Sequence, residues 1–272
     1  MRLCILLLCL HSATLAAAPR VVTSIAPVYE ITAAIMSGGA EPGLIIDGDA
    51  SAHHFAFKPS HMRSLQQADL VIWIDRHFEA GFSRVADTLP SSTRQLELLP
   101  ALSLDGSDGH IWYSPRLLLR SIQIIRDTLL ALDPKHQNLY QANADMLMQD
   151  IRAWRHETRR RWQKRQPRFV TDHNFTTYFE QDFGFGSIAT VHDQHDDHGG
   201  IKDLKRLDNT LRQFPAACLL TLETTPSTLA RSFTRKYDLK IVSLSLEPPG
   251  DPDQPLILQR LTRLTTALEE CI

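Results

Sequence analysis

The sequence feature that most constrains the fold is a long helical pattern without glycine, from Lys135 to Gln166. Apolar residues recur in it at helical intervals and are separated by polar and charged residues. A helix of about 30 residues extends about 45 Å, which is more than one small lobe requires. We therefore predict a rigid linking helix over residues 134–167 that joins two lobes.

Strand-like and helical patterns alternate on both sides of this linking helix. The expected strands are Arg20–Ser24, Leu44–Ile46, Leu70–Ile74 and Gln95–Leu98 in the first half, and Arg168–Thr171, Ser187–Val191, Ala217–Leu222 and Lys240–Leu246 in the second. Such alternation indicates a mostly parallel β-sheet flanked by helices in each lobe. The predicted fold class is therefore α/β, with an N-terminal lobe over residues 19–133 and a C-terminal lobe over residues 168–272.

The N-terminus has the pattern of a cleaved secretory signal over residues 1–18. A positive start is followed by the apolar run Leu3–Leu10 and by small residues that end at Ala18. This run is too short to span a bilayer as a helix, which takes about 20 apolar residues. No other run in the sequence is long and apolar enough to cross a membrane, so we expect a soluble extracytoplasmic protein.

Removal of the signal leaves two cysteines, Cys218 and Cys271. In an exported protein, two cysteines are expected to form one disulfide. The bond would tie the C-terminal tail to the apolar strand around Ala216–Leu222. Because no Cys-x-x-Cys spacing accompanies these residues, we expect the disulfide to be structural rather than redox-active.

Three histidines stand in separate segments of the chain, close to the ends of expected strands. His54 follows the second strand, and His173 follows the first strand of the second lobe. His110 lies in a loop that bears glycine and aspartate, just before a helix. The carboxyl ends of parallel strands are where open α/β sheets bind ligands, and neutral imidazole suits Zn²⁺. The pattern predicts a zinc site between the two lobes.

A structural or transported Zn²⁺ usually has four ligands, so the three histidines require a partner. Glu247 ends the last expected strand and is our first choice for the fourth ligand. His53 and Glu223 are the alternatives among the side chains, and a water molecule is a third. The residues alone leave this choice open.

A short histidine cluster occupies residues 192–200 in the second lobe, in the order His192, His195 and His198. Histidines three residues apart can share a metal ion when the chain turns or forms a helix between them. We consider this cluster a candidate auxiliary zinc site. Its glycines and acidic residues favour the alternative interpretation, an exposed loop without a ligand.

Three segments resemble the ligand segments of the zinc-uptake periplasmic binding proteins. The stretch Asp49–Ser60 is similar to the first, with a histidine followed by Pro-Ser before a helix. The stretch Gly109–Pro115 resembles the second, and His173 with Tyr178–Glu180 resembles the third. This likeness covers nearly the whole mature chain. It implies the solute-binding component of a metal ABC transporter, with two lobes joined by a long helix.

The same resemblance implies His54, His110 and His173 as metal ligands and a disulfide between Cys218 and Cys271. The manganese branch of the family typically has a carboxylate in place of the third histidine, so the three imidazoles favour zinc. Two features depart from the family pattern. Glu247 stands where many relatives have aspartate, and no histidine-rich insertion separates the first two ligand segments.

We expect a protein that captures Zn²⁺ and delivers it to an inner-membrane ABC permease, and not an enzyme. A manganese or iron carrier of the same fold and an adhesin-like relative are alternatives. A zinc hydrolase with Glu223 as general base is a further alternative, although no His-Glu-x-x-His spacing supports it. The net charge of −2 offers no polybasic surface for nucleic acid, and we expect a monomer.

Overall fold

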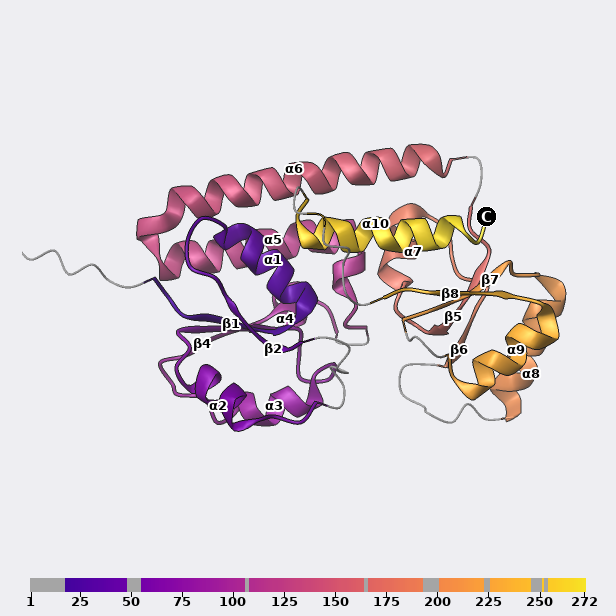
Figure 1. Ribbon diagram of the computed structural model, residues 1–272, viewed down its shortest axis with the longest axis horizontal. Coiled ribbons are helices and arrows are strands. Elements are labelled where there is room, and N and C mark those ends of the chain that lie inside the picture. Colours follow the sequence, from indigo (N-terminus) through magenta and orange to yellow (C-terminus); the bar gives the residue numbers. More distant parts are fainter. Residues whose placement is uncertain are drawn as a thin grey trace, which may run out of the picture.

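The computed structural model describes residues 18–47, 55–105, 108–163, 166–192, 201–222, 226–245, 251 and 254–272, with the backbone alone for residues 201–203. The described part of the chain contains two parallel four-stranded sheets, with the strand orders β2-β1-β3-β4 and β6-β5-β7-β8. Helices flank both sheets, and a long helix crosses from one lobe to the other (Figure 1). The predicted fold class is confirmed.

The first lobe is built from strands and helices that alternate along the chain. Its elements are β1 (Val21–Ile25), α1 (Ala26–Met36), β2 (Gly43–Ile46), α2 (Pro59–Gln66), β3 (Leu70–Trp73), α3 (Ala80–Ala86), β4 (Arg94–Glu97) and α4 (Leu98–Ala101). The short 3₁₀ turn η1 (Ile111–Tyr113) and helix α5 (Pro115–Leu132) follow. Helix α5 starts where the sequence requires it: the Ser114 hydroxyl accepts a hydrogen bond from the Leu117 N–H, and Pro115 occupies the first turn.

The second lobe repeats this arrangement. Its elements are β5 (Phe169–His173), α7 (Thr177–Phe183), β6 (Ala189–His192), α8 (Ile201–Gln213), β7 (Cys218–Thr221), α9 (Thr228–Tyr237), β8 (Lys240–Ser243) and α10 (Leu256–Glu269). Helix α7 ends at Gly184, whose left-handed backbone (φ 76°) is accessible to glycine at little cost.

The linking helix is α6 (Gln137–Arg161), which contains 25 residues and follows the 3₁₀ turn η2 (Pro134–His136). It is shorter at both ends than the 135–166 pattern predicted. The difference at the start arises because Asp133-Pro134 opens a 3₁₀ turn before the α-helix begins. At about 1.5 Å per residue, α6 extends about 37 Å, and it lies along both lobes (Figure 1). None of the described helices is both long and apolar enough to cross a membrane.

Helix α10 returns from the second lobe to pack against α1 of the first (Figure 1). Arg260 on α10 and Glu30 on α1 are both buried and form a bidentate ion pair, with Nε–Oε2 at 2.9 Å and Nη2–Oε1 at 2.5 Å. The structure also contains the expected disulfide between Cys218 and Cys271, with a Cα–Cα distance of 5.4 Å. The disulfide joins β7 to the residues that follow α10, so α10 is fastened to both lobes.

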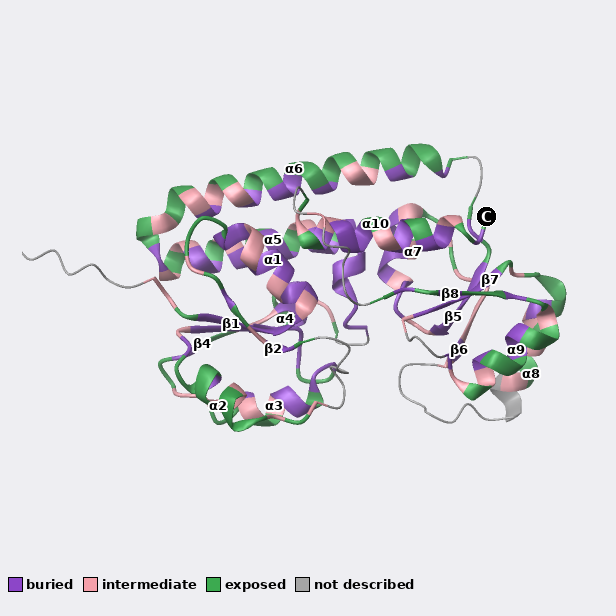
Figure 2. Ribbon diagram, in the orientation of Figure 1, coloured by how far each residue is buried: buried purple, intermediate pink, exposed green. Residues whose placement is uncertain are grey.

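The buried apolar side chains form one large cluster and one small one. The large cluster combines the first sheet with α1, α5, α6, α10 and one face of the second sheet. The small cluster lies on the other face of the second sheet, under α8 and α9, and is made of Val170, Val191, Leu207, Leu211, Leu219, Ala230, Phe233 and Leu239. The two lobes therefore share one core, and the second lobe has a minor core of its own. Figure 2 shows buried stretches on strands of both sheets.

Candidate metal site

His110 lies at the junction of the two lobes, immediately before η1, and its side chain is buried. The Asp108 carboxylate oxygen Oδ1 is 2.9 Å from the backbone N of His110 and 2.9 Å from its ring Nδ1. An ionised carboxylate only accepts hydrogen bonds, so this contact places the proton on Nδ1. Nε2 is then the nitrogen that keeps a lone pair, which is the arrangement typical of histidine metal ligands.

His173 is the last residue of β5, at the carboxyl end of the second sheet. Its ring centroid lies 5.5 Å from that of His110, although the two residues come from different lobes. Two imidazoles on one tetrahedral ion, with Zn–N distances of about 2.0–2.1 Å, place their centroids roughly 5 Å apart. The separation of these two rings is therefore compatible with one shared cation.

Aromatic rings enclose His110 on several sides. Its ring contacts Phe78, Trp112 and Phe175 at centroid distances of 5.1, 5.2 and 6.2 Å. Phe175 also contacts His173 at 5.3 Å, so it touches both histidines. A Cβ atom on Gly109 would come within 2.1 Å of the Phe78 ring, which explains why glycine precedes the histidine. Such apolar surroundings limit the access of water to a bound cation and strengthen its electrostatic interactions.

The carboxyl end of the second sheet carries a polar cluster next to His173. Asp172 accepts hydrogen bonds from the Ser227 hydroxyl (2.9 Å) and the Ser227 backbone N–H (3.0 Å). His192 Nε2 lies 3.0 Å from the same hydroxyl, and His192 pairs with His173 across the β5–β6 register. Because the hydroxyl proton goes to Asp172, His192 donates to Ser227 through Nε2. The hydrogen bonds of this cluster connect β5, β6 and the start of α9.

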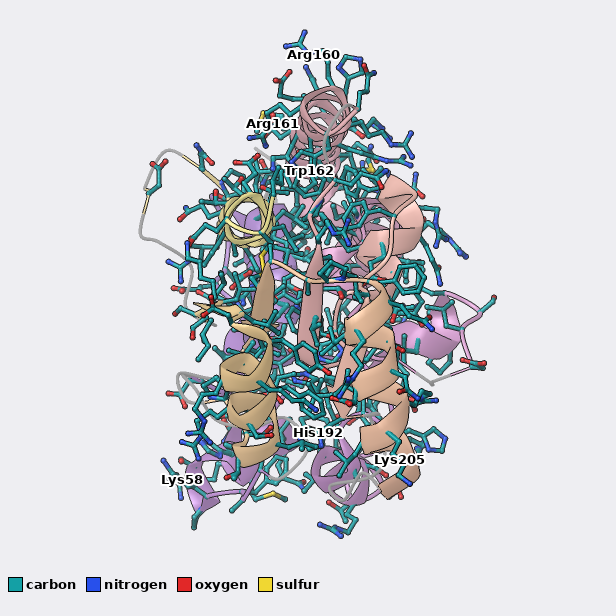
Figure 3. The ribbon with its side chains drawn as sticks, turned by 90° about the vertical axis from the view of Figure 1, so that its right-hand side faces the viewer. Lys58, Arg160, Arg161, Trp162, His192 and Lys205 are labelled. Atoms are coloured by element: carbon teal, nitrogen blue, oxygen red, sulfur yellow. A yellow bond between two sulfur atoms is a disulfide. The ribbon has the colours of Figure 1, made fainter. Side chains whose placement is uncertain are left out.

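These contacts hold the His192 side chain against the second lobe, where it is only partly exposed. Its Nε2 is committed to Ser227, and among the described residues its buried Nδ1 has no hydrogen-bond partner. His195 and His198 lie outside the described residues, so an auxiliary site that includes all three histidines stays a prediction. Figure 3 shows His192 in the lower part of the view, away from Arg160 and Arg161 at the top, which mark the basic end of α6.

The other predicted ligands lie outside the described residues: His53, His54, Glu223 and Glu247. Their segments follow β2, β7 and β8 in sequence. Within the described ranges, no group of three or more histidine, cysteine, aspartate or glutamate side chains is arranged to hold a metal ion. The described part of the chain thus brings together two of the predicted ligands, His110 and His173.

Sequence reasoning did not identify Asp108 or Glu79. Asp108 orients His110, and the Asp-x-His spacing is a local signal that could have revealed it. Glu79 is fully buried at the start of α3, where its carboxylate accepts a hydrogen bond from the Ile74 N–H at 2.5 Å. Burial raises the pKa of Glu79 to about 7. Nothing in the local sequence distinguishes this glutamate from an exposed one.

The chain matches a known protein family over nearly its whole length. The family described as zinc-uptake complex component A, periplasmic, matches residues 21–271. A putative metal-binding protein of Chlamydia muridarum is 24% identical over 262 residues, which cover 92% of this chain and 91% of that protein.

Two solved structures have the same fold. A mutant of the laminin-binding adhesin Lmb of Streptococcus agalactiae has a TM-score of 0.81 and 21% identity, over 93% of this chain and 100% of that one. A manganese-bound mutant of the periplasmic metal-binding protein of Candidatus Liberibacter asiaticus has a TM-score of 0.80 and 20% identity, over the same shares. This protein therefore belongs to the family of the periplasmic component A of zinc-uptake complexes, the non-catalytic, metal-binding solute-binding proteins of ABC uptake systems.

Proposed function

We propose that this protein captures Zn²⁺ in the periplasm, between its two lobes, and delivers the ion to an inner-membrane ABC permease. The observation that carries the proposal is the approach of His110 and His173, at 5.5 Å between ring centroids, from opposite lobes. The orientation of His110 by Asp108 adds support, because it leaves Nε2 for the cation.

We propose His54 and Glu247 as the remaining ligands, with His53, Glu223 or water as substitutes for Glu247. The segments of His54 and Glu247 follow the carboxyl ends of β2 and β8, and β8 runs parallel to β5 in the second sheet. Three imidazoles and one carboxylate form a donor set that suits Zn²⁺ better than Mn²⁺, which prefers oxygen.

The proposed organisation is a signal of residues 1–18, an N-terminal lobe of residues 19–133, a linking helix of residues 134–167 and a C-terminal lobe of residues 168–272. We propose that the protein acts as a monomer and has no nucleic-acid partner. Because α6 and α10 both connect the lobes, wide hinge opening is restricted. Metal release at the permease then uses small tilts of the lobes or movement of the ligand loops.

The test is a calorimetric titration of the purified, chelator-stripped protein with Zn²⁺. We expect one tightly bound equivalent for the native protein. His110→Ala and His173→Ala should each lower the affinity by more than the roughly 10–100-fold that loss of an outer-shell partner costs. His156→Ala is the matched control, since His156 is exposed on α6. A native Zn²⁺ affinity in both His110→Ala and His173→Ala would contradict the proposal.

A manganese carrier is the second candidate, and the manganese-bound relative with a TM-score of 0.80 favours it. A competition titration with equal Zn²⁺ and Mn²⁺ separates the two. If the purified protein retains Mn²⁺ in preference to Zn²⁺, the capture function stands and the choice of zinc is wrong.

A further inference from the structure

Helix α7 lies directly after the strand that carries His173 and reaches across to the first lobe. It begins at Thr177, four residues after His173. Two of its side chains, Tyr178 and Asp182, bond to the first-lobe segment that carries His110, one on each side of the histidine. The helix thus follows the His173 segment in the chain and bonds to the His110 segment on both sides of that histidine.

Tyr178 holds the segment ahead of His110. Its hydroxyl donates a hydrogen bond to the backbone carbonyl of Asp108 at 3.1 Å. Asp108 is the residue whose carboxylate orients the His110 ring. Burial raises the pKa of Tyr178 to about 12, so the hydroxyl remains a protonated donor at any physiological pH. A shift of α7 would therefore be transmitted through Asp108 to His110.

Asp182 holds the segment that follows His110. Its buried carboxylate accepts from the Ser114 hydroxyl at 2.7 Å, from the Arg116 backbone N–H at 2.8 Å and from Arg116 Nε at 3.1 Å. These donors form the first turn of α5, where free N–H groups and the helix dipole favour a negative charge. Arg159 on α6 donates to the Asp182 carbonyl at 2.6 Å and steadies the same end of α7.

From these contacts we propose that Tyr178 and Asp182 are positioning residues that together set the separation and relative orientation of His110 and His173. The inference rests on the proposed function, in which both histidines bind the same cation. The α7 bonds hold the two imidazoles close before metal arrives, so that binding requires little rearrangement. They also determine which coordination geometry the pair offers.

The experiment uses Co²⁺ as a probe, because its visible absorption reports coordination number and geometry. The intact protein, Tyr178→Phe and Asp182→Asn are each titrated with Co²⁺, and the release rate is measured by chelator competition. Tyr29→Phe is the matched control: it removes another tyrosine hydroxyl, which donates to Glu41 in the first lobe at 2.7 Å. Circular dichroism and thermal unfolding establish that each variant is folded.

We expect Tyr178→Phe to bind one Co²⁺ with an affinity lowered about 10-fold, a faster release and a changed visible spectrum, since loss of an outer-shell partner costs about 10–100-fold. Asp182→Asn should shift the same three measurements in the same direction. Tyr29→Phe should match the native protein in all of them. Should Asp182→Asn fail to fold, Tyr178→Phe decides alone.

The inference is overturned if Tyr178→Phe gives the native Co²⁺ spectrum, affinity and release rate, even with a lower melting temperature, because a purely structural role would have that result. Failure of the proposed function has a different signature. In that case His110→Ala and His173→Ala would keep native Co²⁺ binding. If both of these variants lose Co²⁺ binding while Tyr178→Phe behaves like the native protein, only the proposed role of α7 is wrong.

Discussion

The two lobes have the same strand order but differ in what covers the outer faces of their sheets. In the first lobe, the residues that α2 and α3 bury against the sheet, Leu65, Phe82 and Ala86, belong to the large apolar cluster. In the second lobe, the face under α8 and α9 rests on the separate small cluster. Figure 2 shows exposed outer faces on α8 and α9.

This contrast leaves the candidate site on the side of the large cluster. His110 packs against Phe78 and Trp112, and His173 contacts Phe175; all three rings belong to the large cluster. The opposite face of β5 contributes Val170 to the small cluster. Local opening of a protein begins where few apolar contacts hold the structure. The comparison indicates that the outer layer of the second lobe, formed by α8 and α9, opens locally more easily than the layers that pack on the large cluster.

The largest expected effect concerns the joint between the lobes. Arg260→Met leaves Glu30 buried without its partner and should lower the unfolding free energy by about 3–5 kcal/mol, measured by urea denaturation. Lys240→Met is the control, since its ion pair with Glu270 is about half exposed and exposed pairs contribute little. Equal stability of the two variants would mean that the buried ion pair does not help to hold α10 against the first lobe.

The disulfide tests the same joint from the side of the second lobe. Replacement of both Cys218 and Cys271 by serine should lower the unfolding free energy by about 2–4 kcal/mol, the usual range for loss of a bridge. The loss should concentrate in the second lobe and increase hydrogen exchange in β7. Uniform exchange in both lobes would show that the chain unfolds as one unit and would weaken the contrast.

A matched pair of leucines measures the two cores directly. Leu70 on β3 and Leu219 on β7 are both fully buried on equivalent strands, but Leu70 lies in the large cluster and Leu219 in the small one. Truncation to alanine should cost about 1–2 kcal/mol more at Leu70, because the small cluster can collapse around the cavity more completely. Thermal and urea unfolding of both variants give this difference, and a greater cost at Leu219 would reverse the comparison.

The smallest expected effect is a pH dependence of the unfolding free energy, which arises from Glu79 in the first lobe. The pKa of Glu79 is raised by burial from 4.5 to about 7, so the folded protein binds this proton more tightly than the unfolded chain does. The associated stability is fully present below the unfolded pKa and is lost as the pH rises through the folded one. Between about pH 6 and 8 the loss is on the order of 1 kcal/mol. Glu79→Gln should remove this slope in urea titrations at several pH values, and an unchanged slope would assign it to other groups.

The α/β class and the two-lobed plan could be predicted because their signals are periodic and local. Apolar strands such as Leu70–Trp73, and the glycine-free stretch that forms α6, can be recognised in the sequence without tertiary information. Element ends were less accurate: the strand expected over Ser187–Val191 covers Ala189–His192. A terminal residue depends on hydrogen bonds with neighbouring strands, which the local pattern does not contain.

The approach of His110 and His173 was predicted from the rule that ligands gather at the carboxyl ends of parallel strands, and from the resemblance of both segments to ligand segments of zinc-uptake periplasmic binding proteins. The residues that support them were not. Tyr178 and Asp182 bond to segments about 70 residues earlier in the chain, and such pairings leave no trace in local spacing. Whether Glu247 completes the site is likewise a question of tertiary position and stays a prediction.

The pairing of Glu30 with Arg260 has a consequence for how the chain acquires its structure. These partners are 230 residues apart in sequence, and Glu30 is buried, where a carboxylate without a partner is unfavourable. A nascent chain that has emerged only as far as α6 therefore lacks a counter-ion for α1. We therefore expect α1 to reach its final packing only after α10 docks, because this pairing closes a loop of 230 residues.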